Sequence, residues 1–263
     1  MTKIVRLLAG LLLAVTGMVS AAMADAMDDI VKRGEILVGV QSQGAPINFV
    51  DSNGQRTGFA VELVDMMAKD MGIRVTYIDF EWKGLIPALL AGKVDMIAAD
   101  MTPTPERAMK LIFTDPIFFT ENVAFTLKDK PFQKWEDLNN EGVTVGATQA
   151  STYASAVKNY MPKATLKEFA GGTGETAQAI SSGRADAGVS DRGTLRTTLS
   201  EFPDMRILEG TITKEPLAFA LRPDSVHLAF FMNNYIKLAN HDGRLPKLLD
   251  YWWNSLDWQK DHK

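Results

Sequence analysis

The chain has 263 residues, contains no cysteine, and carries 28 Lys and Arg against 32 Asp and Glu. This acidic balance argues against nucleic acid or anionic lipid as a partner, and the lack of cysteine excludes disulfide bonds and thiolate catalysis. The three histidines, His227, His241 and His262, lack the spacing of metal ligands. We therefore expect neither a metal site nor a cofactor.

The first 24 residues have the pattern of a signal peptide. Lys3 and Arg6 precede an apolar stretch at 7–19, and Ala22 and Ala24 frame a small-x-small cleavage site. The apolar stretch is shorter than a membrane span, although an uncleaved membrane anchor is the alternative. Cleavage after Ala24 would remove two basic and no acidic residues, leave a formal charge of −6, and place the mature protein in the periplasm.

Strands and helices alternate through the first part of the mature chain. Apolar runs predict strands at 36–40, 73–77 and 94–99. Helices are expected at 27–32, from 59 to a terminating Gly72, and at 85–91. This order predicts a mainly parallel α/β sheet covered by helices, with ligands bound beyond the carboxyl ends of the strands.

The alternation restarts after residue 116. Strands are expected at 143–147, 164–169 and 187–190, and helices at 151–160 and 176–182. No Gly/Ser-rich or Pro-rich linker separates the two units, so we expect two lobes joined by short strands at 123–127 and 217–221.

The last segment is expected to return to the first lobe. It contains a helix at 225–240 and an aromatic run at 251–253, which suits packing better than cofactor binding. Lobe 1 would then comprise 25–122 plus 216–263, and lobe 2 would comprise 123–215.

The segment that follows the strand at 94–99 reads DMTPTPER and suits carboxylate binding. Thr104 has an N-cap side chain and Pro105 fits the first helical position, so Arg107 falls in the first turn of a helix. A guanidinium held there can bind a carboxylate bidentately. The alternative for an isolated segment of this kind is a surface salt bridge.

Several motifs together resemble the family 3 periplasmic solute-binding proteins, the receptors of ABC importers for polar amino acids. In chain order they are LVGV at 37–40, AP at 45–46, GF at 58–59, Trp82 with LIPAL at 85–89, GKVD at 92–95, TPTPER at 102–107, FTDP at 113–116 and GRADA at 183–187, leading to Asp191. The resemblance implies a clamshell of the type II periplasmic-binding-protein fold, and we expect by default a monomer that is not an enzyme. Its two lobes, joined by two hinge strands, would close on one amino acid, and an inner-membrane permease would recognise the closed shape.

The resemblance also implies roles for particular residues. Arg107 would bind the α-carboxylate, together with Thr102 and the helix start at Ser151 and Thr152. Asp191 would bind the α-ammonium. Considered without the resemblance, Asp191 is better explained as a cap on the next helix, and Ser151 and Thr152 as ordinary N-caps.

The backbone carbonyl of Asp100 and the hydroxyl of Thr102 would complete the ammonium site. Trp82 would form one wall around the ligand side chain, with ordinary packing as the alternative, while Gly44 stands where a second aromatic wall is usual. Gln41 stands where receptors of basic amino acids carry an aspartate.

Asp100 stands where a small residue is usual in the family. If its carboxylate points into the cleft, the surplus negative charge favours a cationic side chain or a second amine on the ligand. If it points outward, it gives no information about the ligand. The sequence leaves both orientations open.

Two other functions are compatible with the same fold. A dehydratase of prephenate-like acids would need a general acid in the cleft, and no carboxylate follows Asp191 before Glu201. A receptor module that signals through a membrane partner would have the same ligand domain. The sequence does not separate this module from a transport protein.

Overall fold

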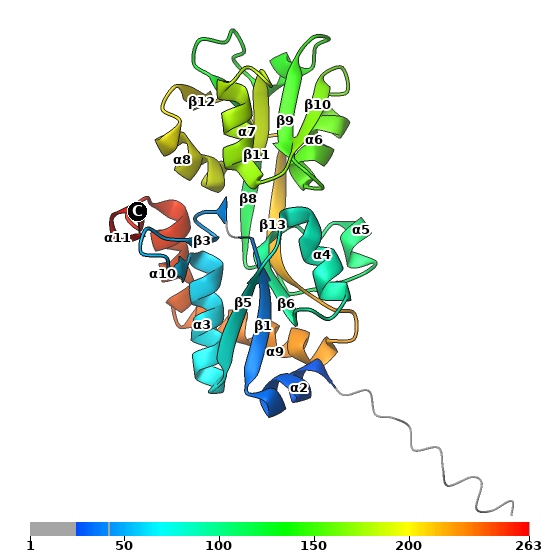
Figure 1. The fold of residues 1–263 in the computed structure, drawn as a ribbon, viewed down its shortest axis with the longest axis vertical. Helices are drawn as coiled ribbons and strands as arrows, with labels where there is room; N and C mark the ends of the chain where they lie inside the picture. Colours follow the sequence, from blue (N-terminus) through cyan, green and yellow to red (C-terminus); the bar gives the residue numbers. More distant parts are fainter. Residues whose placement is uncertain (1–24, 42, 263) are drawn as a thin grey trace, which may run out of the picture.

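The computed structural model describes residues 25–41 and 43–262. The predicted signal peptide at 1–24 therefore lies outside the described residues. Within them, no helix is both long and apolar enough to cross a membrane. The chain folds into two α/β lobes joined by two long strands, β8 (Phe118–Leu127) and β13 (Thr213–Leu221), so the predicted two-lobed architecture is confirmed (Figure 1).

The first lobe contains the parallel sheet that the alternation predicts. Its strand β1 (Glu35–Val40) pairs in parallel with β5 (Arg74–Asp79) and with β6 (Met96–Met101). The main helices of this lobe are α2 (Ala26–Arg33), α3 (Phe59–Met71), α4 (Trp82–Leu90) and α9 (Val226–His241). Apolar residues of α2, α3 and α9 form one buried core with the sheet, which fixes the carboxyl ends of β1 and β6 beside the second lobe.

The C-terminal segment returns to the first lobe, as predicted. Helix α10 (Arg244–Leu249), a π-helical turn at Asp250–Asn254 and the short α11 (Gln259–His262) follow α9. The side chain of Trp252 is buried in the core of lobe 1, where its indole N–H donates to Glu62. Its ring packs against Phe49 and Trp258. Trp252 is therefore a packing residue.

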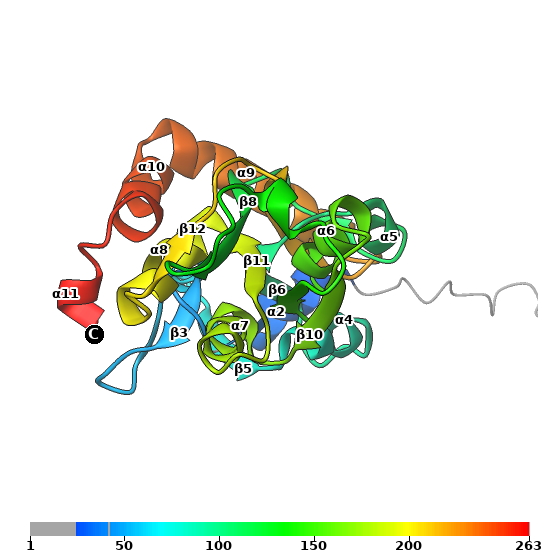
Figure 2. The ribbon, with the colours of Figure 1, turned by 90° about the horizontal axis from the view of Figure 1, so that it is seen from above.

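The second lobe repeats the parallel arrangement. Strand β9 (Thr144–Thr148) pairs in parallel with β10 (Thr165–Phe169) and β11 (Ala187–Asp191). The helices are α6 (Thr152–Tyr160), α7 (Gly172–Ser181) and α8 (Arg192–Glu201). In the view from above, these three helices lie around β11 (Figure 2). Helices α6 and α8 begin directly at the cleft between the lobes.

The two crossing strands pair with each other at the junction of the lobes. Residues 118–122 of β8 run antiparallel to residues 213–217 of β13. Beyond this paired region β13 joins β6 of the first lobe, and β8 joins β11 of the second. One sheet thus continues through both lobes in the order β10-β9-β11-β8-β13-β6-β1-β5. The predicted lobe boundary after residue 122 falls at the end of the paired region and the one after residue 215 falls within it. The division of the chain at those residues stays a prediction.

Sequence periodicity does not predict the shortest elements. These are β2 (Gln43–Gly44), β3 (Asn48–Val50) and β4 (Arg56–Thr57), which form a small antiparallel sheet, together with β7 (Ile112–Phe113), β12 (Met205–Ile207) and a 3-10 turn at Trp135–Leu138. Segments of two to four residues are too short for an apolar repeat to be recognised. The small sheet adds Gly44 to the rim of the cleft.

Candidate functional site

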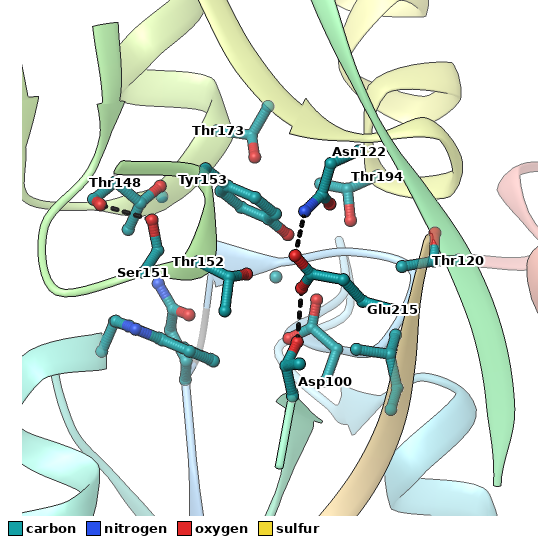
Figure 3. A pocket seen from close by; sticks show the side chains of 16 residues that line it. Asp100, Thr120, Asn122, Thr148, Ser151, Thr152, Tyr153, Thr173, Thr194 and Glu215 are labelled. Atoms are coloured by element: carbon teal, nitrogen blue, oxygen red, sulfur yellow. Dashed lines mark hydrogen bonds between the residues drawn. The ribbon is translucent and has the colours of Figure 1, made fainter. Parts of the chain in front are cut away.

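A cavity lies between the lobes beside the crossing strands. It occupies about 550 Å³, including the part open to solvent, a size that suits one small organic molecule. Both lobes and both crossing strands contribute to its wall, which consists of Gln41, Gly44, Trp82, Asp100, Thr102, Thr120, Asn122, Thr148, Ser151, Thr152, Tyr153, Gly172, Thr173, Thr194, Glu215 and Leu217 (Figure 3). Six of the eight predicted site residues are in this wall, and Arg107 and Asp191 are not.

Arg107 lies in the first turn of the short helix α5 (Pro105–Ala108), as the sequence predicts. Thr104 is the N-cap, and its hydroxyl accepts the backbone N–H of Arg107 at 3.3 Å. The guanidinium donates to the backbone carbonyls of Thr102 at 2.9 Å and Ala150 at 3.1 Å. It faces a second hollow beside the main cavity, which Lys158 also lines. Carboxylate binding by Arg107 stays a prediction.

Trp82 joins Arg107 in a contact between the lobes. The Arg107 guanidinium lies 5.6 Å from the centre of the Trp82 ring, and the Trp82 indole N–H donates to the Ala150 carbonyl at 3.3 Å. Because Ala150 belongs to lobe 2, a single carbonyl of that lobe accepts from two side chains of lobe 1. We call Arg107, Trp82 and Ala150 the mouth contact. The two lobes therefore touch each other at this point.

Ser151 and Thr152 form the start of helix α6. The Ser151 hydroxyl accepts the N–H of Ala154 at 3.2 Å and donates to the carbonyl of Thr148 at 2.6 Å. The prediction that Ser151 is an N-cap is therefore confirmed. Thr152 is the first helical residue and lines the cavity. The helix start thus faces the ligand space, where backbone N–H groups favour a negatively charged group.

Asp191 ends strand β11 and is completely buried. Its carboxylate accepts the N–H of Thr194 at 2.8 Å and the hydroxyl of Tyr153 at 2.8 Å, which confirms its reading as the cap of α8. Burial raises the pKa of Asp191, and the bonds from Thr194 and Tyr153 oppose that rise. Tyr153 lines the cavity and connects it to Asp191. Direct binding of an ammonium by Asp191 stays a prediction.

Glu215 is a site residue that the sequence reasoning does not identify. It lies on β13, and its carboxylate accepts from the amide of Asn122 at 2.6 Å (Figure 3), the hydroxyl of Thr102 at 2.7 Å and the hydroxyl of Thr213 at 3.0 Å. It therefore links the residue that follows β6 in lobe 1 to both crossing strands. All three donors are neutral groups.

Asp100 points into the cavity, which answers the question that the sequence leaves open. It lies near the end of β6, and both Asp100 and Thr102, the residue that follows this strand, line the cavity. Burial, followed by the charge of Asp191, raises the pKa of the Asp100 carboxyl to about 7, although Arg107 lowers it. In the described part of the chain, no other residue donates a hydrogen bond to this carboxylate.

A period of two along the crossing strands could have revealed the missed residues. Thr120 and Asn122 alternate with Glu121 in β8, and both line the cavity. Glu215 and Leu217 alternate in β13 in the same way. The apolar residues that follow in each strand dominate its sequence pattern, so these polar positions are easily taken for loop residues.

The fold and the site define a two-lobed ligand-binding protein, with a cleft whose polar groups come from both lobes and from the strands that join them. The chain belongs to the bacterial extracellular solute-binding proteins, family 3, whose sequence model matches residues 36–255. This result confirms the predicted family.

Individual proteins of this kind are similar along nearly the whole chain. A probable amino-acid ABC transporter-binding protein of Haemophilus influenzae is 27% identical over 228 residues, which cover 86% of this chain and 87% of that protein. Among solved structures, the ancestral amino acid-binding protein AncCDT-1, described as a precursor of cyclohexadienyl dehydratase, is 35% identical with a TM-score of 0.82, covering 87% of this chain and all of the other. A variant of ArgBP from T. maritima is 32% identical with a TM-score of 0.81, covering 88% and 100%.

Proposed function

We propose that this chain is the periplasmic binding subunit of an ABC importer and that it captures an amino acid between its lobes. The observation that carries the proposal is the cavity wall, to which lobe 1 contributes Asp100 and Thr102 and lobe 2 contributes the start of α6 and Tyr153. A zwitterion presents one negative and one positive group, and the wall offers partners for both. Arg107, at the edge of the cavity, would bind the carboxylate with N–H groups that its bonds to Thr102 and Ala150 leave free.

Ligand binding would favour the closed form. A ligand that contacts both lobes at once interacts more strongly with the closed arrangement than with an open one, and only such a difference can shift the equilibrium. The paired strands β8 and β13 would serve as the hinge. The permease would then distinguish loaded from empty protein by shape.

A dehydratase is the alternative that one observation favours. No carboxylate closely follows Asp191, but the carboxyl groups of Asp100 and Glu215 face the cavity and are candidates for a general acid. The pKa of Asp100 is raised to about 7. We propose binding without catalysis because the similar proteins are named as binding proteins. Prephenate incubated with the protein should keep its ultraviolet absorbance, and a loss of absorbance beyond that of a buffer control would contradict the proposal.

A thermal-shift screen of the common amino acids, opines and polyamines tests the proposal. A ligand that binds only the folded state raises the melting temperature. At least one amino acid should do so, and Arg107→Ala should weaken its binding. Arg184→Ala is a matched control, because Arg184 is an exposed arginine of lobe 2 that pairs with Glu175. No response to any amino acid, or unchanged affinity in Arg107→Ala, would contradict the proposal.

Two further experiments address location and partner. The mature protein purified from a periplasmic extract should begin after Ala24 and run as a monomer on size exclusion. Co-purification with a permease would support transport, whereas co-purification with a sensor kinase or chemoreceptor would support the signalling alternative.

A further inference from the structure

The end of the cleft beside the crossing strands is rich in hydrogen-bond acceptors. We call Asp100, Thr120, Asn122, Tyr153 and Glu215 the hinge pocket. Asp100, Asn122, Tyr153 and Glu215 are directed toward one space between the lobes (Figure 3). They come from β6, β8, α6 and β13, so every part of the molecule that meets at the hinge contributes.

Negative charges outnumber positive ones around this pocket. Among the described residues that line the cavity there is no lysine or arginine. Asp100 and Glu215 bring two carboxylates, and Asp191 lies behind Tyr153 as a third. Arg107 is the neighbouring cation: its guanidinium donates to two backbone carbonyls and interacts electrostatically with Glu215 and Asp100. This single positive charge faces three carboxylates.

Two buried polar atoms of the pocket have no hydrogen-bond partner in the described part of the chain. They are the Asn122 side-chain oxygen and the Thr120 hydroxyl, and the two residues are 0% and 6% exposed. The Asn122 amide nitrogen donates to Glu215, so the remaining atom is an oxygen that can only accept. An unpaired buried acceptor is costly. The pocket therefore suits an occupant that brings several N–H donors.

Charge and geometry together restrict the occupant to an organic cation. An anion would be repelled by the carboxylates. A metal ion would need a tighter cluster, because no group of three or more His, Cys, Asp or Glu among the described residues could hold one. A zwitterion with a neutral side chain would neutralise one carboxylate with its ammonium and leave the others uncompensated.

We propose that the hinge pocket binds a second cationic group, so that the ligand is an amino acid with a positively charged side chain or a second amine, such as lysine, ornithine or arginine. This inference rests on the proposed function and makes it more specific. Asp100 and Glu215 are the residues that select for the second charge, and the unpaired oxygen of Asn122 accepts one of its N–H groups.

A calorimetric titration at pH 8 separates the effect of the ligand's charge from that of its shape. Citrulline is a neutral analogue of arginine, and norleucine is a neutral analogue of lysine, each of nearly the same length. We expect the better cation to bind at least 50-fold more tightly than its neutral analogue, since bonds to charged groups contribute about 10-fold or more each. Equal or tighter binding of citrulline, norleucine or glutamine would overturn the inference but leave the proposed function standing. A lack of binding by every amino acid would instead refute the proposed function.

Variants of the hinge pocket locate the selectivity. Asp100→Asn and Glu215→Gln should each reduce the preference for the cation over its neutral analogue by about 10-fold. Glu121→Gln is the matched control, because Glu121 lies between Thr120 and Asn122 but pairs with Arg192 away from the cavity. The control should keep the full preference. An unchanged preference in Asp100→Asn and in Glu215→Gln, or an equal loss in the control, would overturn the inference.

Two measurements keep this test decisive if Glu215→Gln does not fold. Asp100→Asn removes a carboxylate to which no other described residue donates a hydrogen bond, so folding of this variant does not depend on the charge.

Proton release provides a second readout. The titratable groups that face Asp100 are Asp191 on β11, Glu215 on β13, Arg107 on α5 and the hydroxyl of Tyr153 on α6. A cation that enters the pocket should expel a proton from Asp100 at pH 6.5, seen as a buffer-dependent heat in the wild type and absent in Asp100→Asn. A buffer-independent heat in the wild type would overturn the inference.

Discussion

The mouth contact and the hinge pocket, which lie in the same cleft, are built in opposite ways. At the mouth, donors from lobe 1 are satisfied by the backbone carbonyl of Ala150 in lobe 2. In the hinge pocket, acceptors predominate and two of them have no partner among the described residues. The comparison suggests a division of roles: the mouth contact stabilises closure and binds the group that all amino acids share, while the hinge pocket discriminates among their charges.

The largest effect on ligand affinity is expected from a substitution in the mouth contact. Arg107→Ala should weaken binding about 100-fold, because a bidentate carboxylate contact contains two charge-assisted hydrogen bonds. The loss should be similar for arginine and citrulline, because both ligands carry the same α-carboxylate. Calorimetry with both ligands checks this, and a loss confined to arginine would break the proposed division of roles.

The hinge pocket should affect stability in the absence of ligand. The folded state raises the pKa of Asp100 from 3.8 to about 7, so its proton stabilises the folded protein at low pH and this stability is lost as the pH rises through 7. At pH 8 the ionised carboxylate therefore destabilises the folded protein. Asp100→Asn removes this destabilisation and should make the ligand-free protein about 2 kcal/mol more stable at pH 8, roughly half of the free energy that corresponds to the full pKa shift. Urea denaturation at pH 5 and pH 8 measures it, and a variant less stable than wild type at pH 8 would contradict the pKa assignment.

The same titration should make ligand affinity depend on pH. A cation binds the ionised form of Asp100, so affinity for the best cationic ligand should fall about 10-fold between pH 8 and pH 6. Asp100→Asn should bind with little change over this range. An affinity that stays constant in the wild type would show that the positive group does not lie near Asp100.

The smallest effect is expected from Trp82→Phe. This change removes the indole N–H bond to Ala150 and keeps an aromatic ring beneath Arg107. One neutral hydrogen bond contributes about 1 kcal/mol, so affinity should fall about 5-fold without a change in selectivity. Trp135→Phe is the control and should bind as the wild type does, because Trp135 packs against Tyr160 in lobe 2 and does not line the cavity. A loss of selectivity in Trp82→Phe would place the side-chain pocket at the mouth instead.

Local signals in the sequence predict a large part of the fold. Buried apolar runs give β1, β6 and β9 because a strand covered on both faces must be continuously apolar. Thr104 and Ser151 are recognisable as helix caps because a cap depends on the next three residues alone. The structure agrees with both kinds of prediction to within a few residues.

The missed part of the site depends on contacts between distant segments. Glu215 meets Thr102 across 113 positions of the chain and Asn122 across 93. Arg107 is correctly placed in its helix, but its partner Ala150 is 43 residues away in the other lobe. No local pattern encodes such pairs. They follow from how β8 and β13 pair at the hinge, which the sequence alone does not determine.

A crystal structure of the protein with its tightest amino-acid ligand tests the central claim most directly. We predict that the ligand carboxylate lies against Arg107 and the start of α6. A cationic nitrogen of the ligand should lie within hydrogen-bonding distance of Asp100 or Glu215 at the hinge. A ligand whose positive side chain points instead toward Gln41 and Trp82, with only water between Asp100 and Glu215, would contradict the account.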